Sequence, residues 1–292
     1  MPADRIKSCP ICGQWDVDEY LIRNFRNNKI ILEKCRNDAL VINSCWEEEA
    51  SQEHSYQRYV GAFGGYKKLY NYAQRRIALV SKFLNLKKTN LLDVGCSYGV
   101  VISQFEKQGC SVSGLDLNED AINYARKKLN LDGVRYGALK DVPFPKNCFD
   151  AVTLWHVLEH IPDINSFLAQ TGEILKPEGR LFIAVPNMHS IMAKLCRNKW
   201  GWIFPWHIWY FSPETLKNIL EKNGFAIEFI TTDTGDPNNV FHLFEDFNYK
   251  LNKMRFISAV AGRLELIMYF ALNILGKFFN QAEELIVVAK KK

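Results

Sequence analysis

The sequence predicts an α/β fold with a mostly parallel sheet, and three observations support this prediction. Apolar runs with strand character alternate with stretches of helical periodicity along most of the 292 residues. A turn with two glycines, Gly95 and Gly99, follows the apolar run that begins at Leu91. The next apolar run ends in Asp116, about 20 residues past the turn, where a carboxylate can accept both hydroxyls of a ribose. We therefore expect right-handed crossovers and a ligand site at the carboxyl edge of the sheet.

The elements follow in order along the chain. A helical lead-in at residues 66–86 has its apolar positions on one side. The expected strands are residues 91–95, 111–117, 134–137, 149–154, 180–185, 226–231 and 284–289. The expected helices are residues 100–108, 119–129, 164–175 and 213–223, with Asn118 and Ser212 as N-caps of the second and the fourth and Gly224 ending the fourth.

The chain divides into three parts in this interpretation. Residues 1–46 form a small unit with cysteines and two strand-like runs, residues 47–89 are a linker with the helical lead-in, and residues 90–292 are the main α/β domain. Two insertions interrupt the main domain. Residues 199–211 contain four tryptophans, and residues 250–279 form a long apolar stretch that we expect to be helical.

Composition and charge exclude some classes of protein. The net charge of +5 is mild, and the positive charge is scattered apart from the C-terminal Lys290–Lys292, which argues against a nucleic-acid binder. No apolar stretch follows Met1–Arg5, so we expect no signal peptide. The eight cysteines lie mostly in apolar settings, which is typical of a reducing compartment. We therefore expect a cytoplasmic protein.

The turn Gly95-Cys96-Ser97-Tyr98-Gly99 has the form Gly-x-x-x-Gly, whereas a dinucleotide pyrophosphate favours Gly-x-Gly-x-x-Gly. Asp93 through Gly99, together with Asp116, resembles motif I and the acidic loop of class I S-adenosylmethionine-dependent methyltransferases. The similarity continues in residues 142–150, 155–160 and 175–181 and covers about residues 60–235. It implies a Rossmann-like sheet of seven strands, in which an antiparallel strand seven lies between strands five and six. The chain is similar to methyltransferases of type 11/23, which include quinone-biosynthesis O-methyltransferases.

The resemblance implies S-adenosyl-L-methionine as cofactor. Asp93 would orient its methionine amino group, and the turn of Gly95, Cys96 and Gly99 would face its carboxylate and sulfonium with backbone N–H groups. Asp116 would hold the ribose diol, although a carboxylate in this place can also cap the following helix.

The resemblance places three more residues at the cofactor. Leu117 and Leu139 would flank the adenine, and Trp155 would lie at the carboxyl edge of the sheet. Many relatives carry an acid near position 138, where this chain has Ala138, so we expect a backbone contact there.

His156, Glu159 and His160 share one face of a helical turn, and three interpretations remain open. His156 or His160 can act as the general base that takes the proton from a hydroxyl acceptor. Some quinone-biosynthesis relatives carry Glu, Glu and His here, where a magnesium ion is attributed, but His156 in the first position disfavours a hard cation. Glu159 and His160 can also simply order the loop.

His207 lies in the aromatic insertion, ahead of Trp209-Tyr210-Phe211-Ser212-Pro213. A similar histidine is frequent in this methyltransferase group and faces the acceptor, so we list His207 with the candidate catalytic residues, while core packing is the alternative. The tryptophans can form a lid over an apolar or sugar acceptor or the interior of a packed cap.

The N-terminal cysteines resemble a zinc ribbon found ahead of some methyltransferases. Cys9 and Cys12 form a good zinc knuckle. Cys35 belongs to a second knuckle in which Asp38 stands where a cysteine is expected, so either Cys45 or Asp38 would be the fourth ligand of a structural Zn²⁺. A ribbon held by its own strands without metal is the alternative.

The apolar stretch at residues 256–279 is long enough to span a bilayer, but Arg263, Glu265 and Lys277 interrupt it. A core or dimer helix is one interpretation. A membrane-surface helix that recognises a lipid-linked acceptor is the other, so peripheral membrane contact and oligomerisation both stay open.

The function that these features favour is methyl transfer from S-adenosylmethionine to a small-molecule, glycan or lipid-intermediate acceptor, at oxygen. One alternative is an RNA methyltransferase that uses the ribbon for recognition, although Leu154-Trp155-His156-Val157 replaces the Asn/Asp-Pro-Pro-aromatic run of amino-methylating enzymes. Carbon methylation of a nucleotide sugar is another alternative, and a catalytically inactive cofactor-binding module is the last.

Overall fold

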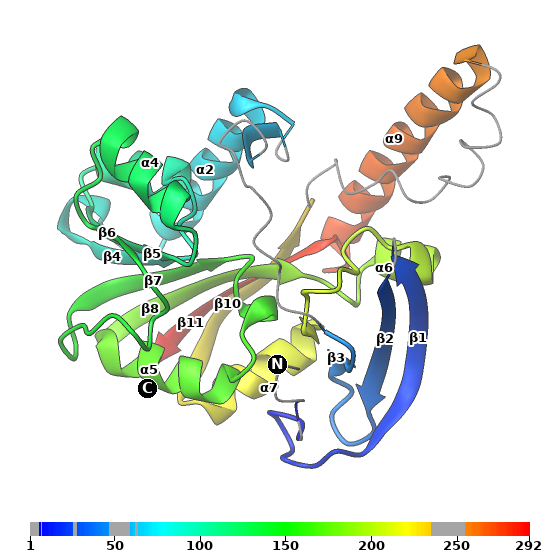
Figure 1. Cartoon of the computed structure of the whole chain (residues 1–292), viewed down its shortest axis with the longest axis horizontal. Helices are drawn as coiled ribbons and strands as arrows, with labels where there is room; N and C mark the ends of the chain where they lie inside the picture. The colour runs from blue at the N-terminus through cyan, green and yellow to red at the C-terminus, as the bar shows by residue number, and fades with distance from the viewer. Residues whose placement is uncertain (1–5, 7, 26–27, 47–58, 62–63, 235–254) are drawn as a thin grey trace. The chain divides into compact units, whose positions relative to one another are not determined.

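The computed structural model describes residues 6, 8–25, 28–46, 59–61, 64–234 and 255–292 (Figure 1). Its contacts divide the chain into two compact units. Unit 1 comprises residues 1–50, 185–218 and 230–286, and unit 2 comprises residues 51–184, 219–229 and 287–292.

A seven-stranded sheet has the order β10-β11-β8-β7-β4-β5-β6. Its strands are β4 (Asn90–Val94), β5 (Ser111–Asp116), β6 (Val134–Tyr136), β7 (Phe149–Trp155), β8 (Leu175–Pro186), β10 (Phe225–Asp233) and β11 (Glu284–Lys291). Strand β4 pairs in parallel with β5 and β7, and the pairs β5–β6 and β7–β8 are also parallel. The predicted fold class is therefore confirmed, and the last strand lies between the fifth and the sixth as expected.

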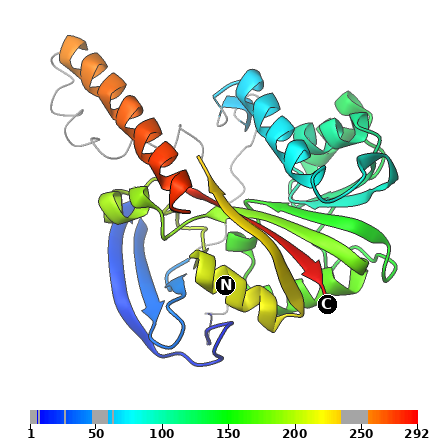
Figure 2. The same ribbon diagram turned by 180° about the vertical axis from the view of Figure 1, so that it is seen from behind.

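Helices cover both faces of this sheet. Helices α2 (Tyr66–Val80) and α4 (Glu119–Leu129) lie on one face and α5 (Ile164–Ile174) on the other, as Figures 1 and 2 show. Helix α3 (Val100–Lys107) follows the glycine turn, and α7 (Pro213–Lys222) precedes β10. Because both faces are covered, β4 and β7 are apolar and buried over most of their length.

The N-caps position two of these helices. The Asn118 side chain accepts a hydrogen bond from the backbone N–H of Ala121 (3.0 Å), so α4 begins directly after the carboxylate that ends β5. Asp163 caps α5 in the same way through Ser166 (3.0 Å). The short 3₁₀ helices η1 (Leu86–Lys88) and η2 (Leu158–His160) precede β4 and follow β7.

Unit 1 contains a second sheet of four strands in the order β1-β2-β3-β9. Strands β1 (Val17–Phe25) and β2 (Asn28–Cys35) correspond to the two predicted strand-like runs, and they pair as an antiparallel hairpin. Strands β3 (Val41–Asn43) and β9 (Trp209–Tyr210) were not predicted. Since β9 belongs to the aromatic insertion, the insertion completes the N-terminal sheet.

The tryptophans of the insertion form the core of unit 1. Trp200 and Trp202 are buried in one cluster with Tyr210, with residues of β2 and β3, and with helix α6 (Ile191–Cys196), which the short helix η3 (Arg197–Lys199) follows. Their large apolar area is removed from water here, which favours a packed cap over an exposed lid.

Helix α9 (Arg255–Phe278) accounts for the predicted helical stretch from Arg255 onward, while residues 250–254 lie outside the described residues. Within the described part of the chain, no helix combines the length and the apolar character needed to cross a membrane.

Candidate cofactor site and cysteine cluster

The glycine turn closes tightly against the end of β5. The backbone N–H groups of Gly95 and Cys96 both donate to the carbonyl oxygen of Leu115, at 2.7 and 2.9 Å. Gly95 has φ +76°, and a Cβ atom there would lie 2.4 Å from Val157. Gly99 has φ +75°, and its Cβ would lie 2.9 Å from the Cβ of Ala125. Both positions therefore require glycine, and the turn stays open to a ligand that approaches the backbone.

Asp116 holds the turn from the other side. Its two carboxylate oxygens accept hydrogen bonds from the backbone N–H groups of Ser97 (2.7 Å) and Asn118 (2.8 Å). A carboxylate oxygen can accept more than one hydrogen bond, so these contacts do not prevent the side chain from accepting the hydroxyls of a ribose. These hydrogen bonds thus stabilise the turn, and the position of Asp116 is compatible with the predicted ribose contact.

Asp93 is buried at the end of β4, with 2% of its surface exposed. The Thr153 hydroxyl on the neighbouring β7 donates to its carboxylate at 2.6 Å. Burial raises the pKa of Asp93 to about 7; the hydrogen bond from Thr153 lowers this pKa, and the negative charge of Asp116 raises it. A buried carboxylate of this kind is stabilised by a bound cation such as the amino group of S-adenosylmethionine.

Cys96 lies inside the turn with a buried side chain. Burial, together with the charges of Asp93 and Asp116, raises the pKa of its thiol well above the ordinary value. The thiol is therefore neutral and contributes packing rather than nucleophilic chemistry.

The two predicted adenine neighbours differ in exposure. Leu117 follows Asp116 and is 71% exposed, whereas Leu139 is buried in the loop after β6. That loop is tied to the end of β5, because the backbone N–H of Gly137 donates to the carbonyl of Asp116 (3.0 Å). Leu117 thus offers an apolar surface that a bound adenine would cover, and the contact with Leu139 stays a prediction.

The buried Trp155 ring contacts a charged residue that the sequence analysis missed. The guanidinium carbon of Arg76 lies 4.8 Å from the Trp155 ring centroid and 4.2 Å from that of Tyr72. Arg76 on α2 is itself buried. Arg76 lies in the buried helical stripe of Leu69, Tyr72 and Val80. A basic residue at a position that the helical period assigns to the core is therefore the sequence feature that could have identified it.

The candidate histidines of unit 2 lie where β7 ends. His156 has φ +58°, which is uncommon for a residue other than glycine, and its backbone N–H donates to Ala184 (2.8 Å). Its Nδ1 lies 3.4 Å from a carboxylate oxygen of the fully buried Glu159. His160 is half-buried in η2. The structure thus pairs His156 with Glu159, and the catalytic role of either histidine stays a prediction.

His207 belongs to unit 1 and is buried. Its ring lies 5.2 Å from that of Phe204, 6.0 Å from Tyr210 and 6.4 Å from Trp202, measured between centroids. These contacts support core packing, and the catalytic role of His207 stays a prediction.

The cysteine cluster brings together Cys9, Cys12, Cys35 and Asp38, whose ligand atoms all lie within 4.8 Å of one another. The thiol of Cys9 donates to the Asp38 carboxylate at 3.0 Å, and the sulfurs of Cys12 and Cys35 are 3.6 Å apart. Tetrahedral zinc with bonds of about 2.3 Å would hold two sulfurs roughly 3.8 Å apart, so this donor set fits the metal. Cys45 is exposed and is not a member of the cluster.

The two turns of the cluster repeat one pattern. Cys9-Pro10-Ile11-Cys12-Gly13 corresponds to Cys35-Arg36-Asn37-Asp38-Ala39, with Asp38 in the place of a cysteine and Ala39 in the place of glycine. Gly13 and Ala39 both have left-handed backbone, with φ +80° and +64°. Their N–H groups donate to the carbonyls of Cys9 (2.8 Å) and Cys35 (3.0 Å).

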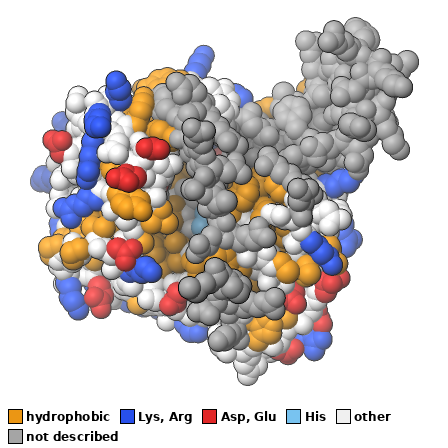
Figure 3. Space-filling view, in the orientation of Figure 1, with side chains coloured by type: hydrophobic (Ala, Val, Ile, Leu, Met, Phe, Trp, Pro, Cys, Tyr) orange, Lys and Arg blue, Asp and Glu red, His pale blue; other side chains and the backbone are white. Residues whose placement is uncertain are grey.

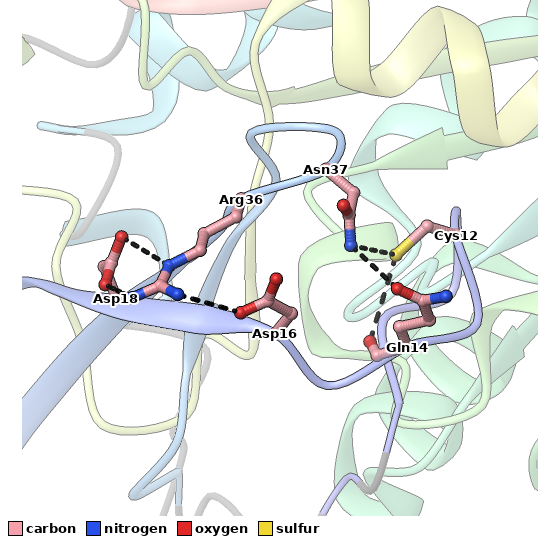
Figure 4. A network of polar contacts seen from close by, with 6 residues as sticks. All are labelled: Cys12, Gln14, Asp16, Asp18, Arg36 and Asn37. Carbon is pink, nitrogen blue, oxygen red and sulfur yellow. Dashed lines mark hydrogen bonds and ion pairs between the residues drawn. The ribbon is translucent and has the colours of Figure 1, made fainter.

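Polar contacts support these turns (Figure 4). The Asn37 amide donates to the Cys12 sulfur (3.8 Å) and to the Gln14 side chain (3.2 Å). Arg36 forms ion pairs with Asp16 (3.3 Å) and Asp18. Such outer contacts orient the ligands of metal sites.

Comparisons with known proteins agree with this geometry. The family model of the methyltransferase domain matches residues 67–228. The ubiquinone biosynthesis O-methyltransferase of Rattus norvegicus is 29% identical over 188 residues, which are 58% of this chain and 54% of that protein. The Homo sapiens enzyme of the same name is 33% identical over 153 residues, or 47% and 42% of the two chains. The chain thus spans about half the length of these relatives.

A solved structure shows the same fold. The SAM-dependent methyltransferase of Archaeoglobus fulgidus is 23% identical, with a TM-score of 0.54 over 82% of this chain and 100% of that one. The fold is that of class I S-adenosylmethionine-dependent methyltransferases, and the glycine turn lies where the sequence resemblance implied. The protein belongs to the methyltransferase domain family.

Proposed function

We propose that this protein transfers the methyl group of S-adenosylmethionine to an oxygen of a small-molecule, glycan or lipid-linked acceptor. The observation that carries the proposal is the glycine turn, which lies between the buried Asp93 and the carboxylate of Asp116 inside the matched methyltransferase domain. The O-methyltransferases of ubiquinone biosynthesis among the relatives support oxygen as the acceptor atom.

The cofactor, when bound, supplies an activated methyl carbon, and the residues of the chain bind and orient the reactants. Asp93 holds the ammonium group, Asp116 the ribose hydroxyls, and the turn before α3 the methionine end. Transfer breaks the sulfur–methyl bond and forms an oxygen–methyl bond, and the hydroxyl proton passes to a base. His156, with its Nδ1 beside Glu159, is the base that the geometry favours, and His160 is the other candidate.

The test is a calorimetric titration of S-adenosylhomocysteine into the purified protein. We expect binding that Asp116→Ala weakens about tenfold or more, because the ribose contacts are lost, which corresponds to about 1.4 kcal/mol. Asp120→Ala is the matched control. Asp120 is an exposed acid in the first turn of α4, close to Asp116 in the chain but outside the glycine turn. A folded wild-type protein that does not bind would contradict the proposal.

The acceptor atom is tested by mass analysis of products formed with an isotope-labelled methyl donor. A label on oxygen supports the proposal, and a label on carbon contradicts it.

On the face drawn in Figure 3, basic and acidic side chains are interspersed around α4, which agrees with an acceptor other than nucleic acid. None of the described cysteines forms a disulfide, which supports the proposal of a reducing, cytoplasmic location.

We also propose that Cys9, Cys12, Cys35 and Asp38 bind a structural zinc ion. The support is the fit of the donor set and the repeat of the two turns. Metal analysis of the purified protein should give one zinc per chain, and Cys12→Ser should lower this content and the thermal stability together. Cys45→Ser is the control and should change neither. Zinc retained in full by Cys12→Ser would contradict the assignment.

A further inference from the structure

The second half of α9 presents an apolar face to solvent. Phe278 is 81% exposed, Ile267 65% and Ile274 54%. With 3.6 residues per turn, the exposed side chains occupy about half of the helix circumference. They are Ile267, Met268, Phe270, Ala271, Ile274, Leu275 and Phe278, and the exposed Phe279 follows directly after the helix. A helix face in water is ordinarily polar, so this face requires a partner.

The opposite side of α9 is fixed within unit 1. The Tyr269 hydroxyl donates to the buried carboxylate of Glu283 at 2.6 Å, and the Asn273 side chain accepts from the Glu283 backbone N–H at 3.1 Å. Gly276 lies so close to the returning chain that a Cβ atom would be 2.7 Å from the carbonyl oxygen of Gln281. The helix therefore cannot rotate its apolar face inward without breaking buried polar contacts.

Positive charge borders this face. Helix α6 contacts α9, and the Lys194 ammonium donates to the Gln281 side chain at 3.0 Å. Leu195, next to it, is 61% exposed. Residues 187–200 and 267–282 contain four basic side chains and no acidic one, the four being Lys194, Arg197, Lys199 and Lys277. Lys277 pairs with Asp233 at 2.5 Å, while the other three lie exposed on α6 and η3.

We propose that this surface, the α9 face with the basic α6–η3 border, docks on an anionic lipid bilayer. Apolar and aromatic side chains enter the acyl boundary of a membrane, while neighbouring Lys and Arg attract anionic headgroups. A second copy is a poorer occupant, because a twofold contact through this face would bring the same cations together. Membrane docking does not depend on which acceptor is methylated. Together with the proposed function, docking would bring the protein to acceptors that dissolve in lipid.

The experiment is vesicle co-sedimentation of the full chain. One set of vesicles is phosphatidylcholine alone, and the other contains added phosphatidylglycerol. We expect binding to the anionic vesicles that falls as salt rises, because counterions screen the basic border. Ile274→Glu/Phe278→Glu should reduce the partition coefficient about tenfold or more, and Lys194→Gln/Lys199→Gln should reduce it to a similar extent.

Matched variants separate docking from loss of folding. Tyr66→Glu/Tyr70→Glu makes the same charge change at two exposed side chains of α2, and it should leave vesicle binding unchanged. Circular dichroism and S-adenosylhomocysteine titration should show each variant folded and able to bind. No binding of the wild-type protein to anionic vesicles would overturn the proposal, as would equal binding of the α9 variant. Dimerisation through this face without vesicle binding would assign it to a second copy instead.

Discussion

Asp93 is the residue at which burial most changes the chemistry of the site. Its folded pKa of about 7 lies above the ordinary 3.8, chiefly because the carboxylate is desolvated. The folded protein therefore holds a proton that the unfolded chain releases at lower pH. The stability that this proton contributes is complete below the unfolded pKa and is lost as the pH rises toward 7.

This pKa predicts how cofactor binding depends on pH. A bound ammonium group requires the ionised carboxylate, so S-adenosylhomocysteine affinity should fall by up to about tenfold for each pH unit below 7. Calorimetry in a series of buffers between about pH 5 and pH 8 measures this slope. Asp93→Asn should bind weakly with little dependence on pH. A wild-type affinity that stays constant over this range would contradict the role of Asp93.

At the residue scale, local sequence is a good guide to the glycine turn and a poor guide to the fourth member of the cysteine cluster. Gly95 and Gly99 were found from their spacing because a tight turn restricts φ directly. The sequence leaves the choice between Asp38 and Cys45 open, because it is the pairing of β1 with β2, with Val17 opposite Cys35, that brings the second turn beside the first.

At the scale of elements, helix α2 covers one face of the sheet and also places a buried charge beside the candidate cofactor site. Its buried face includes Arg76, whose guanidinium contacts the rings of Tyr72 and Trp155. Guanidinium groups bind carboxylates through charge-assisted, often bidentate hydrogen bonds. The carboxylate of S-adenosylmethionine is an anion that the adjacent site would supply.

We therefore predict that Arg76→Met weakens S-adenosylhomocysteine binding about tenfold or more, because a charge-assisted contact is lost. Methionine keeps the apolar stem, so the free energy of unfolding should fall by only about 1–2 kcal/mol, the value of the lost cation–π contacts. Titration calorimetry and urea unfolding measure the two effects. Arg75→Met is the control, since Arg75 is exposed on the same helix. Full affinity in Arg76→Met would exclude Arg76 from cofactor binding.

The sequence did not predict strands β3 and β9 or their pairing. Each strand is too short for a periodic signal, and the partners Ile42 and Trp209 are far apart in the chain. Asn43 reinforces the pairing, because its buried amide donates to the carbonyls of Pro205 (3.0 Å) and His207 (3.1 Å). Such contacts depend on the tertiary arrangement and leave no trace in a local pattern.

At the scale of the whole molecule, the two candidate sites belong to different units. The cofactor site lies within unit 2 and the cysteine cluster within unit 1. A ligand that binds only the folded state stabilises it by mass action, by about 2.7 kcal/mol at a hundredfold excess over Kd. Each ligand should therefore protect the unit that binds it.

We predict that S-adenosylhomocysteine raises the midpoint of thermal unfolding by roughly 5 °C or more at that concentration. A zinc chelator should lower the stability of unit 1, which hydrogen exchange resolved by peptide should report in residues 8–45. Asp116→Ala should lose the first effect and keep the second. A chelator effect confined to unit 2 would contradict the assignment of the metal.

The sequence alone predicts the α/β class, the succession of strands in the seven-stranded sheet, the glycine turn with Asp116, and three of the four members of the cysteine cluster. Each of these has a local cause, such as alternating periodicity, a backbone angle or a short spacing. The three-dimensional structure is needed to show that Asp38 joins the cluster, that Arg76 lies against Trp155, and that the aromatic insertion completes the N-terminal sheet. These depend on contacts between segments distant in the chain, where burial and geometry rather than local propensity select the partner.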